Sequence, residues 1–169
     1  MGRYDASVSA LKNWFTALET EGVSDIASKG GVNEILLANA LGHELVPGDK
    51  GADGRDSDGK VHEYKVSITD QYNFEFGFRP DKFVKGKRSK KVEKMVKDHF
   101  RNISTAICAE RKKGSAELTR VVQCDSKVVV KDLLEHFDKY GPKRILKNYS
   151  LDNFAKLPGS VDLTTTLDQ

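Results

Sequence analysis

The segment that most constrains this chain is the acidic, glycine-flanked stretch over residues 51–65, which reads GADGRDSDGKVHEYK. Acids followed by glycine are typical of EF-hand calcium loops, which need acids at positions 1, 3 and 5, Gly at position 6 and Glu at position 12. With Gly59 at position 6, Gly54 falls at position 1 and Lys65 at position 12. Both end ligands are missing, and a cation replaces the second, so the stretch does not fit a calcium loop.

The same stretch fits a β-hairpin. A three-residue loop over residues 57–59, with Gly59 in the left-handed region, would form a type I turn followed by a G1 bulge. This loop places Asp53 opposite Glu63, with β-carbons ~5 Å apart. Lys65 lies two residues beyond Glu63 and points to the same face, whereas Tyr64 points to the other. A two-residue turn would instead place Asp53 opposite Tyr64 and break the group.

Asp53, Glu63 and Lys65 on one face indicate a site for a divalent cation. Two adjacent carboxylates repel each other unless a cation neutralises them, and hard oxygen ligands suit Mg²⁺. The backbone carbonyl of Tyr64 is a further candidate ligand. A bound metal acidifies water for attack on phosphorus, and a neighbouring lysine can hold the hydroxide and offset the charge that develops on the phosphorane. The alternative interpretation of this loose spacing is a surface hairpin with ordinary cross-strand ion pairs.

Hydrophobic periodicity predicts an α/β (α+β) fold, with a mixed sheet flanked by helices. The expected helices cover residues 6–21, 32–41, 89–100 and the span from Asp125 or Ser126 to residue 140, and the expected strands cover residues 43–46, 60–68, 72–78, 103–109 and 118–124. The length of 169 residues and the 38% hydrophobic content suit one domain over residues 1–169. The helix within residues 1–22 is a candidate dimer element. Leu151, Phe154 and Leu157 suggest a short helix, and residues 164–169 are expected to be loose.

Positive charge is concentrated in one block. Residues 79–101 contain ten Lys or Arg and three acids, a net charge of +7, whereas the rest of the chain carries −4. Such a block favours contact with DNA phosphates, although a solvated helix face is the alternative. The residues expected to contact DNA are Arg79, Lys85, Lys87, Arg88, Lys90, Lys91 and Lys94.

Several neighbouring side chains have two interpretations. Arg79, Asn73 and Gln71 have the chemistry to read base edges. The aromatic residues at alternate positions over residues 72–78 are more typical of a sheet face packed into the core than of a base-stacking surface.

Cysteine, apolar and histidine patterns limit other functions. Cys108 and Cys124 lie in apolar runs and are predicted to be reduced core residues of a cytoplasmic protein. No signal peptide is evident, and no apolar run approaches the ~18 residues of a membrane span, so no membrane partner is expected. The four histidines show no metal-binding spacing, and His62 is expected to face away from Glu63.

The wider stretch over residues 33–68, NEILLANALGHELVPGDKGADGRDSDGKVHEYKVSI, resembles type II restriction endonucleases of the PD-(D/E)xK superfamily. The likeness lies in an apolar helix, a Val-Pro-Gly turn, Gly-Ala-Asp at Asp53 and Glu-Tyr-Lys at residues 63–65. Outside this stretch it extends only to element order and size. Ala52 departs from the usual proline before the first acid. Lys50 stands where an acid would have supplied a second metal site.

The resemblance implies a restriction-endonuclease-like core and Mg²⁺-dependent hydrolysis of double-stranded DNA by a homodimer. It makes Asp53 and Glu63 metal ligands and Lys65 the catalytic lysine, with Glu34 as an additional acid near the metal. Glu34 has a second interpretation as a helix-start residue that interacts favourably with the helix dipole. The first hypothesis is therefore a type II restriction endonuclease with no nucleotide cofactor. The alternatives are a non-catalytic DNA-binding module on a nuclease-like core and a structure-selective repair nuclease.

Overall fold

The computed structural model describes residues 5–20, 31–46, 52–76, 90–141 and 145–167, and it divides into two units, Met1–Val32 and Asn33–Gln169. Each unit is described by itself. The first contains helix α1 (Asp5–Thr20), which agrees with the predicted helix over residues 6–21. Its Trp14 and Phe15 rings lie 5.6 Å apart between centroids, and Phe15 is 42% exposed.

Six described strands of the second unit form a mixed sheet in the order β1-β2-β3-β5-β6-β8. They are β1 (Glu44–Leu45), β2 (Gly54–Arg55), β3 (Val61–Ser67), β5 (Ile103–Arg111), β6 (Leu118–Asp125) and β8 (Val161–Asp162). Strands β3 and β5 are parallel, and the other neighbouring pairs are antiparallel. Strands β4 (Tyr72–Glu75) and β7 (Ile145–Tyr149) form a separate antiparallel pair.

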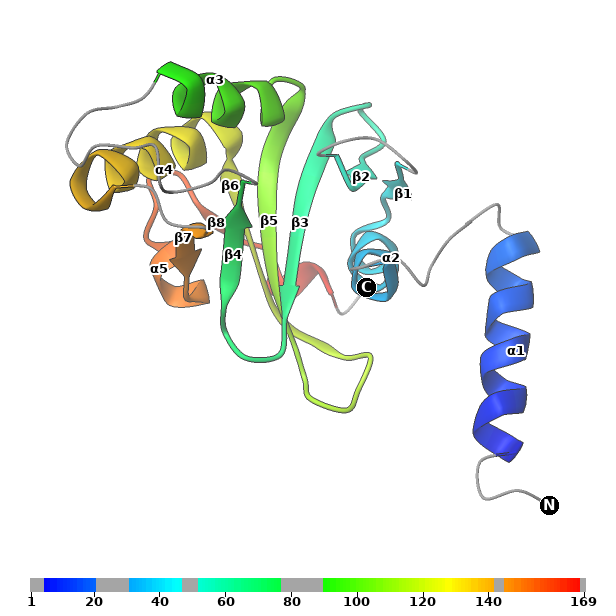
Figure 1. Cartoon of the computed structure of the whole chain (residues 1–169). Coiled ribbons are helices and arrows are strands. Elements are labelled where there is room, and N and C mark those ends of the chain that lie inside the picture. The colour runs from blue at the N-terminus through cyan, green and yellow to red at the C-terminus, as the bar shows by residue number, and fades with distance from the viewer. Residues whose placement is uncertain (1–4, 21–30, 47–51, 77–89, 142–144, 168–169) are drawn as a thin grey trace. The chain divides into compact units, whose positions relative to one another are not determined.

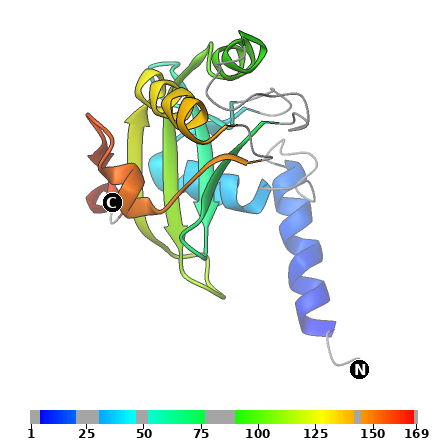
Figure 2. The same cartoon turned by 60° about the vertical axis from the view of Figure 1, so that its left-hand side comes forward.

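Helices cover both faces of the six-stranded sheet, as Figures 1 and 2 show. Helix α2 (Gly31–Leu41) lies on one face, and α3 (Lys90–His99), α4 (Ser126–Tyr140) and α5 (Leu151–Ala155) contribute to the core on the other. Helix α4 begins where the sequence predicts, because the Asp125 carboxylate accepts a hydrogen bond from Lys127 N. It ends at Gly141, whose φ of 75° is in the left-handed region.

Strand β5 separates two hydrophobic clusters. Ala106 and Cys108 belong to the larger cluster with α3, α4 and α5, whereas Ile107 and Ala109 belong to the smaller one with Leu37 of α2. Successive side chains of a strand point to opposite faces, so a segment that packs against apolar residues on both faces forms a continuous apolar run, as residues 106–109 do. This explains the continuous apolar run of β5 and fixes it at the centre of the unit.

The predicted fold class is confirmed at the level of a mixed sheet flanked by helices. The aromatic side chains of Tyr72, Phe74 and Phe76 are buried, as predicted for a core-facing strand. Cys108 and Cys124 are both buried and unpaired, in agreement with the prediction. The short helix predicted around Leu151 and Phe154 is present as α5.

Three features of the C-terminal third differ from expectation. Strand β7 was not predicted, and it pairs with β4 in a separate two-stranded sheet. Strand β8 adds to the edge of β6. The expectation that residues 164–169 are loose is wrong for the first of them: Thr164–Thr166 form a 3₁₀ turn, and the Thr164 hydroxyl oxygen accepts a hydrogen bond from Val121 N at 3.1 Å. Leu163 and Leu167 pack on the smaller cluster, which holds this turn in place.

Some predicted features lie outside the described residues. These are the DNA-contact candidates Arg79, Lys85, Lys87 and Arg88, the strand end at Phe78, and Lys50. Within the described part of the chain, no helix has the length and apolar character needed to cross a bilayer.

Candidate active site

The β2–β3 hairpin has the turn that the sequence predicts. Gly54 pairs with His62 and Arg55 with Val61, and Gly59 has a φ of 80°. The Asp56 carboxylate accepts hydrogen bonds from Asp58 N at 3.0 Å and Lys60 N at 2.8 Å, which closes the loop. The three-residue loop therefore sets the register that brings residue 53 beside residue 63.

Asp53 is fixed at the start of this hairpin. Its backbone N donates to His62 O at 2.8 Å, and its Oδ2 accepts a hydrogen bond from Tyr64 N at 2.6 Å. The carboxylate thus leans toward the strand that carries the other two predicted site residues. One of its oxygens is held by the backbone of that strand.

Glu63 and Lys65 meet on the opposite face of β3 from Tyr64, as predicted. The Lys65 ammonium contacts Glu63 Oε1 and donates to Tyr64 O at 3.2 Å. It also lies 5.6 Å from the centre of the Phe74 ring. Glu63 is only 4% exposed, so the structure brings a nearly buried carboxylate and a lysine together beside Asp53.

His99, the last residue of α3, also reaches this group. Its Nε2 lies 3.4 Å from Glu63 Oε2. The sequence interpretation missed it, because the spacing of the histidines carries no metal motif. The one available signal is its position at the end of a predicted helix that leads directly into a buried strand.

The charges of the site shift one another's pKa values. Burial raises the pKa of Asp53, the nearby Glu63 charge raises it further, and the hydrogen bond from Tyr64 N and the Lys65 charge offset this only in part. Burial also favours a higher pKa for Glu63, but the hydrogen bond from His99 and the charge of Lys65 outweigh it and lower that pKa. Burial disfavours the charged form of Lys65, yet the Glu63 charge and hydrogen bond leave its pKa raised.

Glu34 of α2 lies within the field of the same group. Burial and the Asp53 charge raise its pKa to about 7, with Lys65 opposing and Glu63 adding to the rise. The site therefore contains three acids, Glu34, Asp53 and Glu63, and one lysine. An excess of carboxylate in a partly buried position favours binding of a cation.

The chemistry of these donors fits Mg²⁺. Asp53, Glu63 and the Tyr64 carbonyl offer hard oxygen atoms, and Mg²⁺ is commonly held by one or two carboxylates with several waters. Among the described residues, no three His, Cys, Asp or Glu side chains are arranged to hold a metal alone. Asp53, Glu63 and the Tyr64 carbonyl are the groups of the protein that would hold the ion.

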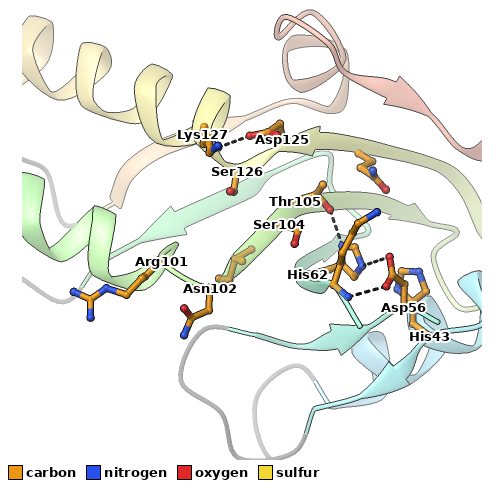
Figure 3. A pocket seen from close by; sticks show the side chains of 13 residues that line it. His43, Asp56, His62, Arg101, Asn102, Ser104, Thr105, Asp125, Ser126 and Lys127 are labelled. Atoms are coloured by element: carbon orange, nitrogen blue, oxygen red, sulfur yellow. Dashed lines mark hydrogen bonds and ion pairs between the residues drawn. The ribbon is translucent and has the colours of Figure 1, made fainter. Parts of the chain in front are cut away.

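A separate polar cavity of about 540 Å³ opens near the start of β3 and β5 (Figure 3). None of Asp53, Glu63 or Lys65 lines it. His62 forms part of its wall, with Nδ1 hydrogen-bonded to Thr105 Oγ1 at 2.7 Å and Nε2 3.4 Å from Asp56 Oδ2. His62 therefore faces away from Glu63 and ties β3 to β5 and to the hairpin loop, in agreement with its predicted structural role.

Behind the site, Tyr64 packs directly against β2. An added β-carbon at Gly54 would lie 2.0 Å from the Tyr64 hydroxyl oxygen. That hydroxyl is hydrogen-bonded to His43 Nδ1 at 2.7 Å, and the His43 ring stacks on His62 with centroids 4.7 Å apart. Because Gly54 has no side chain, the Tyr64 ring can pack against the backbone of β2 at this position.

No protein-family model matches this chain, and no curated protein matches it at a significant level. The functional interpretation therefore depends on the site and on the sequence resemblance.

We predict that Gly54→Ala will lower the free energy of unfolding by about 1–3 kcal/mol, because the new methyl group forces Tyr64 away from His43. Urea unfolding followed by circular dichroism measures the change. Arg55→Ala, on the exposed neighbour, is the matched control and should stay within about 0.5 kcal/mol of the parent protein. Equal effects of the two substitutions would contradict the packing described for Tyr64.

A second prediction concerns Glu34. Its pKa is higher in the folded chain than its ordinary value of 4.5, so the folded state binds the proton more tightly. The stability that this group contributes is fully present below pH 4.5 and is lost as the pH rises through about 7. Glu34→Gln should therefore stabilise the metal-free protein more at pH 8 than at pH 5.

Urea unfolding of parent and variant at both pH values tests this prediction. Burial lowers the pKa of His43 and His62, so these residues make the folded state more stable as the pH rises, opposite to Glu34. Because parent and variant are compared at the same pH, this contribution cancels. Glu44→Gln, at an exposed position of β1, is the control. A Glu34→Gln difference that does not change with pH would contradict the prediction.

Proposed function

We propose that this protein is a Mg²⁺-dependent type II restriction endonuclease. It hydrolyses phosphodiester bonds of double-stranded DNA at a short palindromic site and leaves 5′-phosphate and 3′-hydroxyl ends. The observation that carries the proposal is the convergence of Asp53, Glu63 and Lys65 on one face of the β2–β3 hairpin.

The sequence resemblance supports the same proposal. The stretch over residues 33–68 that resembles type II restriction endonucleases covers most of α2, β1, the hairpin and all of β3. The described helix, α2, packs on the sheet whose strand β3 carries Glu63, Tyr64 and Lys65. The proposal also implies that the mixed sheet and its helices form a restriction-endonuclease-like core.

Each side chain of the site has a distinct role in the proposed reaction. Asp53 and Glu63, with the Tyr64 carbonyl, hold Mg²⁺, which when bound polarises the phosphodiester and acidifies the attacking water. Lys65 orients that water and stabilises the negative charge that develops on the phosphoryl oxygens. Glu34 adds negative potential, which favours entry of the cation.

The partner is double-stranded DNA, contacted in part by α3. Lys90 and Lys94 are exposed on this helix, while Val92 and Val96 face the core. Lys94 pairs with Asp98, and Lys97 pairs with Glu93 at 2.6 Å, so part of the positive charge is neutralised within the helix. Exposed pairs of this kind are weak, and phosphate groups can compete for their lysines.

A homodimer suits the proposed palindromic site, because a two-fold axis relates two active sites to two strands. The exposed Phe15 of α1 offers an apolar contact for a second copy of the chain. The proposal therefore keeps α1 as the candidate dimer element.

The alternative function is a DNA-binding module without catalysis. The observation that favours it is the pairing of both Glu63 oxygens, one with Lys65 and one with His99. In that interpretation the group is a buried structural ion pair on a nuclease-like core. A structure-selective repair nuclease would use the same site chemistry but would cut without a fixed sequence.

We predict that Lys65→Ala and Asp53→Ala will each reduce DNA cleavage at least about 100-fold, because each removes a group that stabilises charge in the transition state. The assay incubates purified protein with Mg²⁺ and genomic DNA of known sequence, and the ends are mapped by sequencing. Lys60→Ala, in the exposed loop of the same hairpin, is the control and should cut normally. Circular dichroism verifies that all variants fold.

The pattern of ends separates the candidate functions. Identical ends at a palindrome support the restriction endonuclease, whereas scattered ends point to a structure-selective nuclease. DNA that is shifted in a gel but remains uncut supports the binding module. Full cleavage by Lys65→Ala or Asp53→Ala would refute the assigned site.

The contribution of α3 to DNA binding has its own prediction. Lys90→Glu combined with Lys94→Glu should weaken DNA binding and reduce the slope of log Kd against log salt by about 1–2, because one or two phosphate contacts are lost. Fluorescence anisotropy in Ca²⁺ at several NaCl concentrations measures the slope. Lys112→Glu, exposed in the β5–β6 turn, is the control. An unchanged slope would assign these lysines to a solvated surface.

A further inference from the structure

The Glu63 carboxylate receives its two contacts from different parts of the fold. Lys65, which reaches Oε1, is its neighbour on β3, whereas His99, which reaches Oε2 at 3.4 Å, comes from α3. A carboxylate that is 4% exposed has lost nearly all its water and needs such partners. Removing either partner therefore changes the orientation or the charge balance of the same group.

The His99 ring is held in a fixed orientation. It makes edge-to-face contacts with Phe76, at 5.2 Å and 87°, and with Phe100, at 4.9 Å and 80°. Both phenylalanines are buried in the larger cluster, which also contains Val92 and Val96 of α3. Edge-to-face contacts favour one ring orientation. The packing of His99 on Phe76 and Phe100 therefore keeps its Nε2 directed toward Glu63.

Compared with His99, Lys65 is less committed to Glu63, because its ammonium has other contacts. Its ammonium also donates to the Tyr64 carbonyl, and it is the group that faces substrate in the proposed reaction. A phosphate would compete with Glu63 for that ammonium. Among the described residues, His99 makes its ion-pair contact with Glu63, at 3.4 Å, so substrate would compete with Glu63 for Lys65 but not for His99.

We propose that His99 is a positioning residue for the cation site. Its imidazole holds Oε2 and so fixes the orientation of the Glu63 carboxylate, which leaves Oε1 to be shared between Lys65 and a divalent cation. The inference rests on the proposed function for the presence of the cation. Groups that orient a metal ligand commonly change metal affinity 10- to 100-fold when they are removed.

Two substitutions separate positioning from packing. His99→Phe keeps an aromatic ring between Phe76 and Phe100 but has no donor. His99→Gln loses the ring but carries an amide nitrogen with similar reach. If the hydrogen bond matters, Gln will retain function and Phe will not, and if the ring packing matters, the order will be reversed.

The experiment measures Mn²⁺ binding to the full chain by electron paramagnetic resonance in the absence of DNA. We expect His99→Ala and His99→Phe to weaken Mn²⁺ binding about tenfold, and His99→Gln to stay within about threefold of the parent protein. In DNA cleavage, His99→Phe should lower kcat and leave the KM for DNA unchanged. Parent-like Mn²⁺ binding by His99→Phe, or equal losses with Phe and Gln, would overturn the inference.

A metal-free measurement keeps this test independent of the proposed function. In protein labelled with ¹⁵N histidine, Glu63→Gln should shift the His99 Nε2 resonance, because a charge-assisted bond becomes a neutral one. Glu44→Gln should leave that resonance unchanged. Absence of Mn²⁺ binding by the parent protein would refute the proposed function, whereas an unshifted His99 resonance in Glu63→Gln would refute the positioning role alone.

Discussion

The register of the β2–β3 hairpin is the constraint on which the candidate site depends. Side chains alternate along a strand, so a slip of one residue would turn Glu63 and Lys65 to the face that Tyr64 now occupies. Gly59 prevents this slip, because its left-handed φ of 80° closes a three-residue loop that pairs Gly54 with His62. A turn that contributes no side chain to the candidate site thus determines which carboxylates meet.

The site also depends on the two-sided burial of the sheet. Strand β3 pairs in parallel with β5, and helices cover both faces of this pair. Glu63 is thereby placed where water is largely excluded, so its charge is stabilised by Lys65 and His99 rather than by solvent. The same exclusion raises the pKa of Asp53 and Glu34. A nearby cation would stabilise the ionised form of both carboxylates.

Local features of the chain were predictable, and long-range ones were not. The turn at Gly59 and the cap at Asp125 follow from residues within four positions of each other, so the sequence alone indicates them. The pairing of β3 with β5 joins segments about 40 residues apart, and His99 reaches Glu63 only because that pairing brings the end of α3 over the site. Strand β8 has only two residues and no hydrophobic alternation, so its place beside β6 comes from tertiary contacts alone.

The position of Cys108 has a consequence for how the site region opens. This thiol lies in register with Lys65 on the adjacent strand, is fully buried, and has a pKa that burial raises well above its ordinary value. A buried, protonated thiol does not react with alkylating reagents until its surroundings separate. The rate at which Cys108 is alkylated would therefore report how often β5 separates from the helices that cover it.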